Sequence, residues 1–434
     1  MSAPDSTSTV QPKAEDSSQI FSPTDVSKAW LEAILKRVSR DDEPMKIVEY
    51  ECKVATQKGD NYTSDLQRVT MNVMTGSGRQ KKVSIIIKEL PNTELKRAMI
   101  SDWNIFLREI VMYRDVLPTM AEIQNEFGDY SDLLWGRCLD YRPYDKIVLE
   151  DITKYGYKMN DRRLGLDYQH CQLVIRSLAK FHALSLHMKA RQLIPMEIFG
   201  TCFFQRRADD KSRIQLSVMF SKALENLIQT MQEKWEPEWS PIADRLKPLV
   251  PVFLDKVVDL ITRDDTKFNV LNHGDCWLNN MMFKYGIDSE TPITVKFVDY
   301  QLCYFSTPVC DLLYFLSTST NYDVRTKHMQ NLIEEYHKTL VRFANLYEYK
   351  GPMITFDELK NEIKRCSLIT LFYSLMLLPL MLIEKAEDVP DMEKMIKETQ
   401  NDPEFKPEWL PILGETFSKY MKLILKGVIE NNAI

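Results

Sequence analysis

The spacing of hydrophobic positions changes character about a third of the way along the chain. Up to residue 150, short runs of apolar and β-branched residues predict strands, and two segments with helical spacing interrupt them. From residue 151 onward, apolar residues recur every three or four positions over long segments, which predicts helices. The first part is expected to hold strands at Lys46–Ala55, Leu66–Met74, Val83–Lys88, Leu134–Tyr141 and Lys146–Glu150, and helices at Asp25–Val38 and Glu94–Leu117, the latter ending before Pro118.

The second part combines long helices with a few short strands. Together with the first part it predicts an α+β chain with a two-lobed plan: a disordered polar tail (1–22), a sheet-rich N-terminal lobe (23–150) and a larger helical C-terminal lobe (151–434). Its helices are expected at Asp167–Ala190, Ile214–Glu233, Pro241–Thr262, Tyr322–Tyr347, Phe356–Lys385 and Pro407–Val428, and its strands at Val270–Asn272, Met281–Lys284 and Ile293–Val298.

One apolar segment reaches the lower limit for a membrane span. Cys366–Ile383 is an uncharged run of 18 residues. It contains Thr370, Ser374 and Pro379, and a charged helical segment leads directly into it. We therefore interpret it as a buried core helix and expect no membrane span.

Charge and cysteine content exclude several classes of protein. Lys and Arg number 56 against 62 Asp and Glu, a net charge of −6 without a basic tract, which disfavours nucleic-acid binding. The 8 cysteines are scattered and form no CxxC pair, so neither a zinc site nor a disulfide framework is indicated. The first residues lack the apolar run of a secretory signal. A cytoplasmic protein with reduced thiols is the expectation.

The segment around His273 contains the most specific chemical pattern. The order His-Gly-Asp, four residues, then Asn places Asp275 five residues before Asn280, and a strand then leads to Asp299 in Asp-Tyr-Gln. Phosphoryl transfer uses such a set: one carboxylate orients and deprotonates the acceptor hydroxyl, while an Asn and a second carboxylate bind Mg²⁺. The spacing is that of a protein-kinase catalytic loop with another second residue.

A kinase also needs a cation for the ATP phosphates and a carboxylate that positions it. Lys88 ends the apolar strand SIIIK, and the following helix carries Glu109, which we predict as its partner. Glu94 is an alternative partner nearer the start of that helix. A solvated lysine and a surface glutamate are the competing interpretation.

Two further segments are candidates for nucleotide contacts. The turn Gly59–Ser64, through Asn61, Ser64 and its backbone N–H groups, could cover phosphates, although an ordinary turn competes. Strand Lys146–Glu150 leads into a connector whose backbone would bond adenine, at Leu149, Glu150 and Ile152. The glycines of Thr75–Lys82 also suggest a nucleotide loop, but a hairpin turn fits better because no GK[ST] or helix follows.

These motifs resemble the insect-type ecdysteroid kinase-like proteins, within the choline-kinase and aminoglycoside-phosphotransferase group. The resemblance runs in order from about residue 50 to 320 and implies a protein-kinase-like fold that uses ATP and Mg²⁺ to phosphorylate a hydroxyl of a small molecule. The matching segments are GDNYTS with Arg68, the Lys88 strand, FLREIVMYRDVLP, VLEDI, LAKFHALS, HGDCWLNNMMF, VDYQ and PVCDLLYFL.

The resemblance also implies roles for individual residues. Asp275 becomes the catalytic base, Asn280 and Asp299 the Mg²⁺ ligands, and Lys88 with Glu109 the phosphate-anchoring pair. His273 is implied to brace the catalytic loop. Asp311 is implied to brace the same loop, with a simple helix N-cap as the alternative. Three further histidines lack the i, i+4 spacing that favours a metal site on a helix, and we interpret them as core or surface histidines: His170, His182 and His187.

The acceptor is expected to be small. Asp311 follows Asp299 by only 12 positions, and no Ala-Pro-Glu follows, so there is no room for a protein kinase's activation segment. An ecdysteroid or another apolar alcohol, xenobiotics included, is the preferred acceptor. A choline or ethanolamine kinase and a catalytically silent ligand-binding pseudokinase remain alternatives. Met and aromatic residues between about 151 and 265 could wall an acceptor pocket, although ordinary core packing is the more common use of such residues.

Overall fold

The computed structural model of the chain describes residues 26–38, 45–55, 64–91, 97, 104–143, 145–202, 204–205, 210–383 and 414–434. The predicted tail, Asn61 with most of its turn, and Glu94 lie outside these ranges. The described chain divides into two compact units, one formed by Met1–Cys52 with Thr70–Val83 and the other by Lys53–Val69 with Ser84–Ile434. The boundary that we predict between residues 150 and 151 stays a prediction.

The first unit joins a helix to the start of the N-terminal sheet. Helix α1 (Lys28–Val38) buries its apolar face, and its Glu32 carboxylate accepts a hydrogen bond from the backbone N–H of Ile47 in strand β1 (Lys46–Val54), 3.0 Å away. The Thr75–Arg79 segment closes a tight turn, in which Gly78 N–H donates to the Thr75 carbonyl. The hairpin interpretation of this segment is therefore confirmed.

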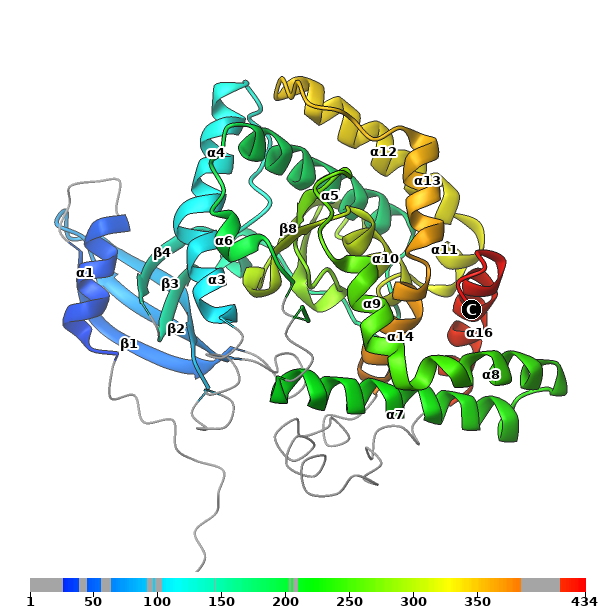
Figure 1. Cartoon of the computed structure of the whole chain (residues 1–434). Coiled ribbons are helices and arrows are strands. Elements are labelled where there is room, and N and C mark those ends of the chain that lie inside the picture. Colours follow the sequence, from blue (N-terminus) through cyan, green and yellow to red (C-terminus); the bar gives the residue numbers. More distant parts are fainter. Residues whose placement is uncertain are drawn as a thin grey trace, which may run out of the picture. The chain divides into compact units, whose positions relative to one another are not determined.

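The N-terminal sheet has five strands in the order β1-β2-β3-β5-β4 (Figure 1). The pairs that flank β5 are antiparallel, with Lys88 opposite Ile147 and Leu149 opposite Ile86. All five predicted strands are present, with ends shifted by up to four residues. Their bounds beyond β1 are β2 (Asp65–Met74), β3 (Gln80–Glu89), β4 (Cys138–Arg142) and β5 (Lys146–Glu150).

The long helix before β4 runs past the proline at which we predicted its end. Helix α3 (Ile105–Val111) passes through a π-helical turn, η1 (Met112–Val116), into α4 (Leu117–Glu126). Pro118 stands in the first turn of α4, where the N–H that it lacks is not needed. The wider turn just before it shifts the hydrogen-bond register, so the helical path continues.

Helices dominate the remainder of the chain (Figure 1). Three predicted helices are interrupted: Pro241–Thr262 by a 3₁₀ segment with two prolines, Tyr322–Tyr347 at His328, and Phe356–Lys385 at Cys366. The helices are α5 (Tyr168–Ala190), α6 (Met196–Phe199), α7 (Lys211–Lys234), α8 (Ser240–Leu246), α9 (Phe253–Ile261), α10 (Val309–Thr318), α11 (Tyr322–Lys327), α12 (Met329–Leu346), α13 (Phe356–Arg365), α14 (Leu368–Leu382) and α16 (Glu415–Glu430).

Two short antiparallel ribbons lie among these helices. One pairs β6 (Val270–Asn272) with β9 (Tyr304–Ser306), and the other pairs β7 (Met281–Tyr285) with β8 (Pro292–Phe297). We did not predict β9, because three residues are too few for a periodicity to show. Since the two ribbons share their connecting loops, the loop 273–280 and the segment 298–303 are brought together.

The apolar segment predicted as a core helix forms α14. Its side chains are largely buried, and they pack against α10 and α16. Within the part of the chain that the structure describes, no single helix has both the length and the apolar composition to cross a membrane; α13 and α14 would do so only as a pair, and they are bent by 63°.

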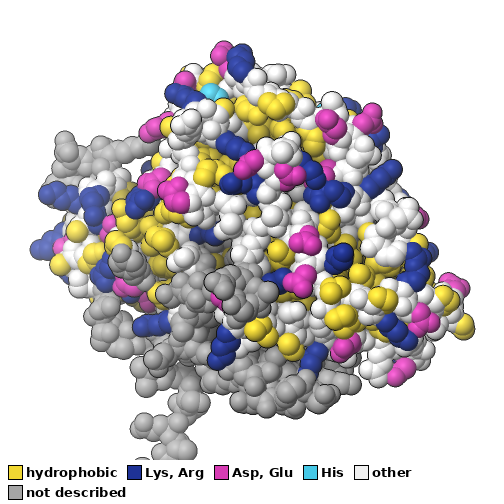
Figure 2. Space-filling model, in the orientation of Figure 1, with side chains coloured by type: hydrophobic (Ala, Val, Ile, Leu, Met, Phe, Trp, Pro, Cys, Tyr) yellow, Lys and Arg dark blue, Asp and Glu magenta, His cyan; other side chains and the backbone are white. Residues whose placement is uncertain are grey.

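The predicted class is confirmed: an α+β chain with an antiparallel N-terminal sheet and a larger helical part. On the face shown in Figure 2, Lys and Arg side chains alternate with Asp and Glu, and no continuous basic patch is visible among the described residues.

A buried carboxylate ties three helical elements together and makes stability depend on pH. Asp129, just after α4, accepts hydrogen bonds from Lys180 of α5 (2.8 Å) and from Tyr347 at the end of α12 (2.6 Å). Burial alone would raise the pKa of Asp129, but the bonds from Lys180, Ser131 and Tyr347 outweigh it and lower the pKa to about 2. The ionised carboxylate therefore stabilises the folded chain.

We expect Asp129→Asn to lower the free energy of unfolding by about 1–2 kcal/mol at pH 7. The stabilisation by Asp129 is complete above the pKa of an unfolded Asp and is lost as the pH falls toward the folded value of about 2. Urea unfolding of both proteins from pH 7 to pH 3 measures this: the difference should shrink with decreasing pH. A difference that grows toward acid would contradict the assignment.

Candidate active site

The β7–β8 hairpin brings Asn280 and Asp299 together. Met281 pairs with Phe297, which places Asn280, one residue before β7, opposite Val298. The backbone N–H of Val298 donates to the backbone carbonyl of Asn280 at 3.0 Å. Asp299 is the next residue along the chain. One antiparallel pairing thus brings together two residues that are 19 positions apart in the sequence.

Helix α10 holds the first half of the loop 273–280. Asp311, the third residue of α10 and not its N-cap, accepts the backbone N–H groups of His273 (2.6 Å) and Gly274 (2.9 Å). The same carboxylate contacts His182 Nε2 at 3.2 Å, and His182 Nδ1 bonds the hydroxyl of Tyr336. His182 is buried, which agrees with its interpretation as a core histidine, and it contacts Asp311.

His273 fixes the position of the loop relative to Asp299. Its Nε2 donates to the carbonyl of Val298 at 3.1 Å, while its Nδ1 accepts the N–H of Asp275 at 3.4 Å. These contacts require the neutral ring with hydrogen on Nε2. Burial lowers the pKa of His273, which favours the same neutral form.

The close approach of two loops requires a glycine between His273 and Asp275. Its φ is +80°, and a Cβ at this position would lie 2.1 Å from the carbonyl oxygen of Leu302. Any side chain would collide with the backbone that follows Asp299, so only glycine allows the two loops to approach this closely.

Asp275 is held through both carboxylate oxygens. Tyr314 of α10 donates to Oδ1 at 2.5 Å, and the side-chain nitrogen of Asn280 donates to Oδ2 at 2.7 Å. Burial and the nearby charge of Asp299 raise the pKa of Asp275 to about 6. The carboxyl is therefore mostly ionised at pH 7 and has more basicity than an exposed Asp.

Lys88 contacts two carboxylates at once. Its Nζ lies 2.6 Å from Glu109 Oε2 and 2.7 Å from Asp299 Oδ1, and the side chains of Lys88 and Glu109 are 3% and 0% exposed. Burial disfavours the charged amine, but Asp299 and Glu109 outweigh it and raise the pKa of Lys88. Burial raises the pKa of Glu109 to about 7 although Lys88 opposes the shift. The solvated-lysine interpretation is thus excluded.

Asp299 has a left-handed backbone, with φ 67° and ψ 62°. Aspartate tolerates this region better than most residues, yet the conformation is uncommon and concentrates at functional sites. It directs the carboxylate toward Lys88 at the point where β8 ends.

A pocket with a cavity volume of about 170 Å³ adjoins these residues. Seven predicted site residues line it: Lys88, Glu109, Leu149, Glu150, Ile152, Asn280 and Asp299. Ser64, directly before β2, is buried and is not among the lining residues, so the structure gives no support to its predicted contact. Apolar side chains form much of the remaining wall, among them Leu66, Ile86, Met159, Met282 and Val298.

The predicted acceptor-wall residues are used differently. Most of the described Met and aromatic residues named for this wall belong to or pack against the hydrophobic core and do not line this pocket: Met188, Met196, Phe199, Phe204, Met219, Phe220, Trp235 and Trp239. Met159, from the same stretch of sequence, does line it. Phe204 and Phe220, for example, pack against Phe372 of α14. Phe203 lies outside the described residues.

Sequence reasoning missed a buried carboxylate at the connector. Asp151 accepts hydrogen bonds from Ser84 (2.6 Å), Arg68 Nε (3.0 Å) and Thr153, and both Asp151 and Arg68 line the pocket. Those bonds outweigh burial and lower the pKa of Asp151. The motif VLEDI contained this residue, but nothing local distinguishes it from a surface aspartate.

Comparison with known proteins decides the family. A sequence model of the ecdysteroid kinase-like family matches residues 58–349, more than half of the chain. The chain belongs to the ecdysteroid kinase-like family. The match covers every predicted site residue from Asn61 to Asp311, and the family supports a small-molecule phosphotransferase.

Other comparisons add little. No curated protein matches the sequence. Among solved structures, an amicoumacin kinase in complex with AMP-PNP, Ca²⁺ and Ami matches with 11% identity and a TM-score of 0.31, over 83% of this chain and 91% of that one. This score is too low for the likeness to support an argument.

The buried pair gives a prediction that separates stability from function. Lys88→Met leaves the buried Glu109 without its cation, so we expect the free energy of unfolding to fall by about 3 kcal/mol. Adding Glu109→Gln removes the uncompensated charge and should restore most of that loss, without restoring nucleotide affinity. Urea unfolding and nucleotide titration of the single and double variants measure both. Recovery of nucleotide binding in the double variant would contradict a phosphate-anchoring role.

Proposed function

We propose that this family member is an ATP-dependent phosphotransferase that moves the γ-phosphoryl group of ATP to a hydroxyl of an apolar small molecule, an ecdysteroid or another apolar alcohol. One observation supports this most strongly. Lys88 contacts both Glu109 and Asp299, while Asn280 contacts Asp275, and four of these five side chains line one pocket.

The polar side chains that line the pocket, an amine and several oxygen ligands, fit a nucleotide with a divalent cation. The side-chain nitrogen of Asn280 donates to Asp275. The side-chain oxygen of Asn280 is therefore the atom left to bind a cation, together with the Asp299 carboxylate. Hard cations such as Mg²⁺ prefer such oxygen ligands. Bound MgATP would supply the phosphoryl group and neutralise the charge that develops on it.

The chain's own residues then have distinct tasks. The Lys88 ammonium, held by Glu109, would contact phosphate oxygens. Leu149 and Ile152 would border the adenine; since the Glu150 N–H already donates to the Arg137 carbonyl at 2.9 Å, other backbone groups of the connector must bond the base. Asp275 would orient the acceptor hydroxyl and accept its proton.

The segment after Asp299 supports a small acceptor. The residues up to Asp311 are used by a 3₁₀ turn (Tyr300–Leu302), by β9 and by the start of α10. No length is left for a peptide-binding activation segment. The family's description favours a steroid-like alcohol.

A transfer assay tests the proposal. The protein is incubated with γ-labelled ATP, Mg²⁺ and, separately, ecdysteroids, choline, ethanolamine and xenobiotic alcohols. We expect a labelled ester with an apolar alcohol. Preference for choline or ethanolamine would favour that type of kinase, and a thermal shift with MgATP but no transfer to any alcohol would favour the pseudokinase alternative.

A further inference from the structure

One turn of α10 contacts three consecutive residues of the catalytic loop. Asp311 and Tyr314 are three positions apart and therefore share a helix face. Asp311 accepts the N–H groups of His273 and Gly274, and Tyr314 donates its hydroxyl to the carboxylate of Asp275. The backbone and the side chain of the loop are thus held by neighbouring residues of one helix.

The two donors on Asp275 act on different oxygens. Asn280 bonds Oδ2 at 2.7 Å and Tyr314 bonds Oδ1 at 2.5 Å. One donor alone leaves a carboxylate free to turn about its bond to Cβ, whereas two donors on separate oxygens fix its plane. A base must meet its acceptor hydroxyl in a narrow range of geometries, and displacements of about 1 Å can cost a hundredfold in rate.

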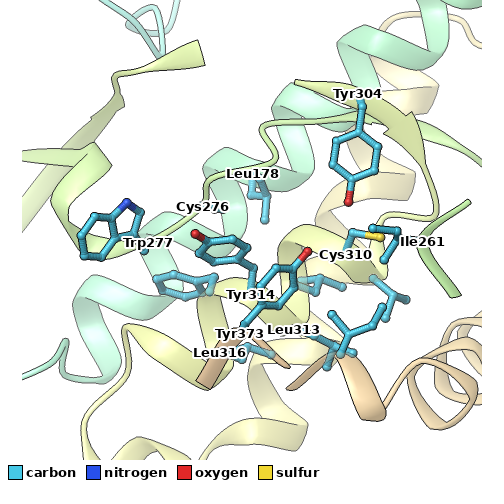
Figure 3. Close-up of a cluster of buried hydrophobic side chains, with 14 of the residues drawn as sticks. Leu178, Ile261, Cys276, Trp277, Tyr304, Cys310, Leu313, Tyr314, Leu316 and Tyr373 are labelled. Carbon is cyan, nitrogen blue, oxygen red and sulfur yellow. The ribbon is translucent and has the colours of Figure 1, made fainter. Parts of the chain in front are cut away.

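Tyr314 is itself rigidly placed. Its side chain is buried, and its ring packs against Tyr373 of α14 with centroids 4.1 Å apart (Figure 3). Trp277, Cys276 and Leu313 belong to the same buried cluster. Because the ring is fixed by packing, replacement by phenylalanine would remove the hydroxyl and leave the surroundings in place.

We propose that Tyr314 is a positioning residue for Asp275: the Tyr314 hydroxyl fixes the plane of the Asp275 carboxylate, which receives the acceptor's proton. This inference rests on the proposed function. It assigns to α10 two connected tasks: Asp311 sets the path of the loop, and Tyr314 sets the orientation of the group that the loop presents.

The test compares two Tyr→Phe variants that each remove a buried hydroxyl bonded to an Asp. Tyr314→Phe should lower kcat about 10- to 100-fold, with KM for ATP and the Kd of MgATP within about twofold of wild type. Tyr347→Phe, whose hydroxyl bonds Asp129 at 2.6 Å and has no contact with Asp275, is the matched control and should keep wild-type kcat. The assay uses γ-labelled ATP with the alcohol that gives the highest wild-type rate. ATP hydrolysis without any acceptor alcohol is measured in parallel as ADP release.

A double-variant cycle completes the test. In an Asp275→Asn background, Tyr314→Phe should have almost no further effect, because the group that it positions is gone. An equal loss in both backgrounds, an unchanged kcat, or a joint loss of kcat, ATP affinity and thermal stability would overturn the inference. A wild-type protein without transfer to any alcohol would instead refute the proposed function, so the two failures are distinguishable.

Discussion

Asp275→Asn is expected to lower the rate of phosphoryl transfer by about 10²–10⁴-fold, the usual contribution of a positioned base. The shape of the loop should survive. The new side-chain oxygen can accept from Asn280, and its nitrogen can donate to the Tyr314 hydroxyl, which is able to act as an acceptor instead of a donor. The affinity for MgATP should change little, because the base does not bind the cation. Single-turnover transfer and nucleotide titration measure the two effects.

Asp129→Asn is the matched control for this variant. It replaces another hydrogen-bonded Asp, whose partners are Lys180, Ser131 and Tyr347 and not Asn280 and Tyr314. It should reduce stability at pH 7 and leave turnover unchanged. If Asp275→Asn keeps wild-type turnover, the phosphotransferase interpretation of this site is wrong.

Local patterns in the sequence were sufficient for eight of the nine strands that the structure describes, all but β9, and for the order of the site residues. An apolar strand ending in Lys88, a helix carrying Glu109 and the two acidic loops each have a local signature, and the structure brings Lys88, Glu109 and Asp299 into contact. Asn280 lies beside Asp299 because β7 and β8 form a hairpin, which alternating apolar residues predict well.

The contacts that orient the loop have no local signature. Tyr314 lies 39 residues from Asp275, and His182 lies 129 residues from Asp311. A tyrosine in an apolar helix and a histidine in an amphipathic one look like ordinary core residues until packing selects their partners. Gly274 has no local signature either, because glycine is required there by the carbonyl of Leu302, which lies in another loop.

Helix ends were the least predictable feature. Pro118 is a strong helix-stop signal, yet the π-helical turn of Met112–Val116 allows α4 to continue. Register changes of this kind depend on how α3 packs within its unit, and the sequence of the helix alone does not record that packing.

Asp299→Asn is expected to impair both turnover and Mg²⁺-dependent nucleotide binding. The substitution removes a full negative charge from a site whose oxygen ligands suit a hard cation. The backbone should remain in place, because asparagine tolerates the left-handed conformation that Asp299 adopts. Lys88 can still donate to the amide oxygen, and Glu109 still pairs with it. The loss therefore reports on the cation site and not on the fold.

The contrast with Asp275→Asn makes the assignment decisive. For Asp299→Asn we expect the Kd of MgATP to rise at least about tenfold, and partial recovery of both affinity and turnover as the Mg²⁺ concentration increases, because mass action offsets a weakened site. Asp275→Asn should show no such recovery, since the missing group is a proton acceptor. Nucleotide titrations and transfer rates over a range of Mg²⁺ concentrations compare the two variants directly. If Asp275→Asn is the variant that loses Mg²⁺-dependent binding while Asp299→Asn retains it, the roles of the two carboxylates are reversed.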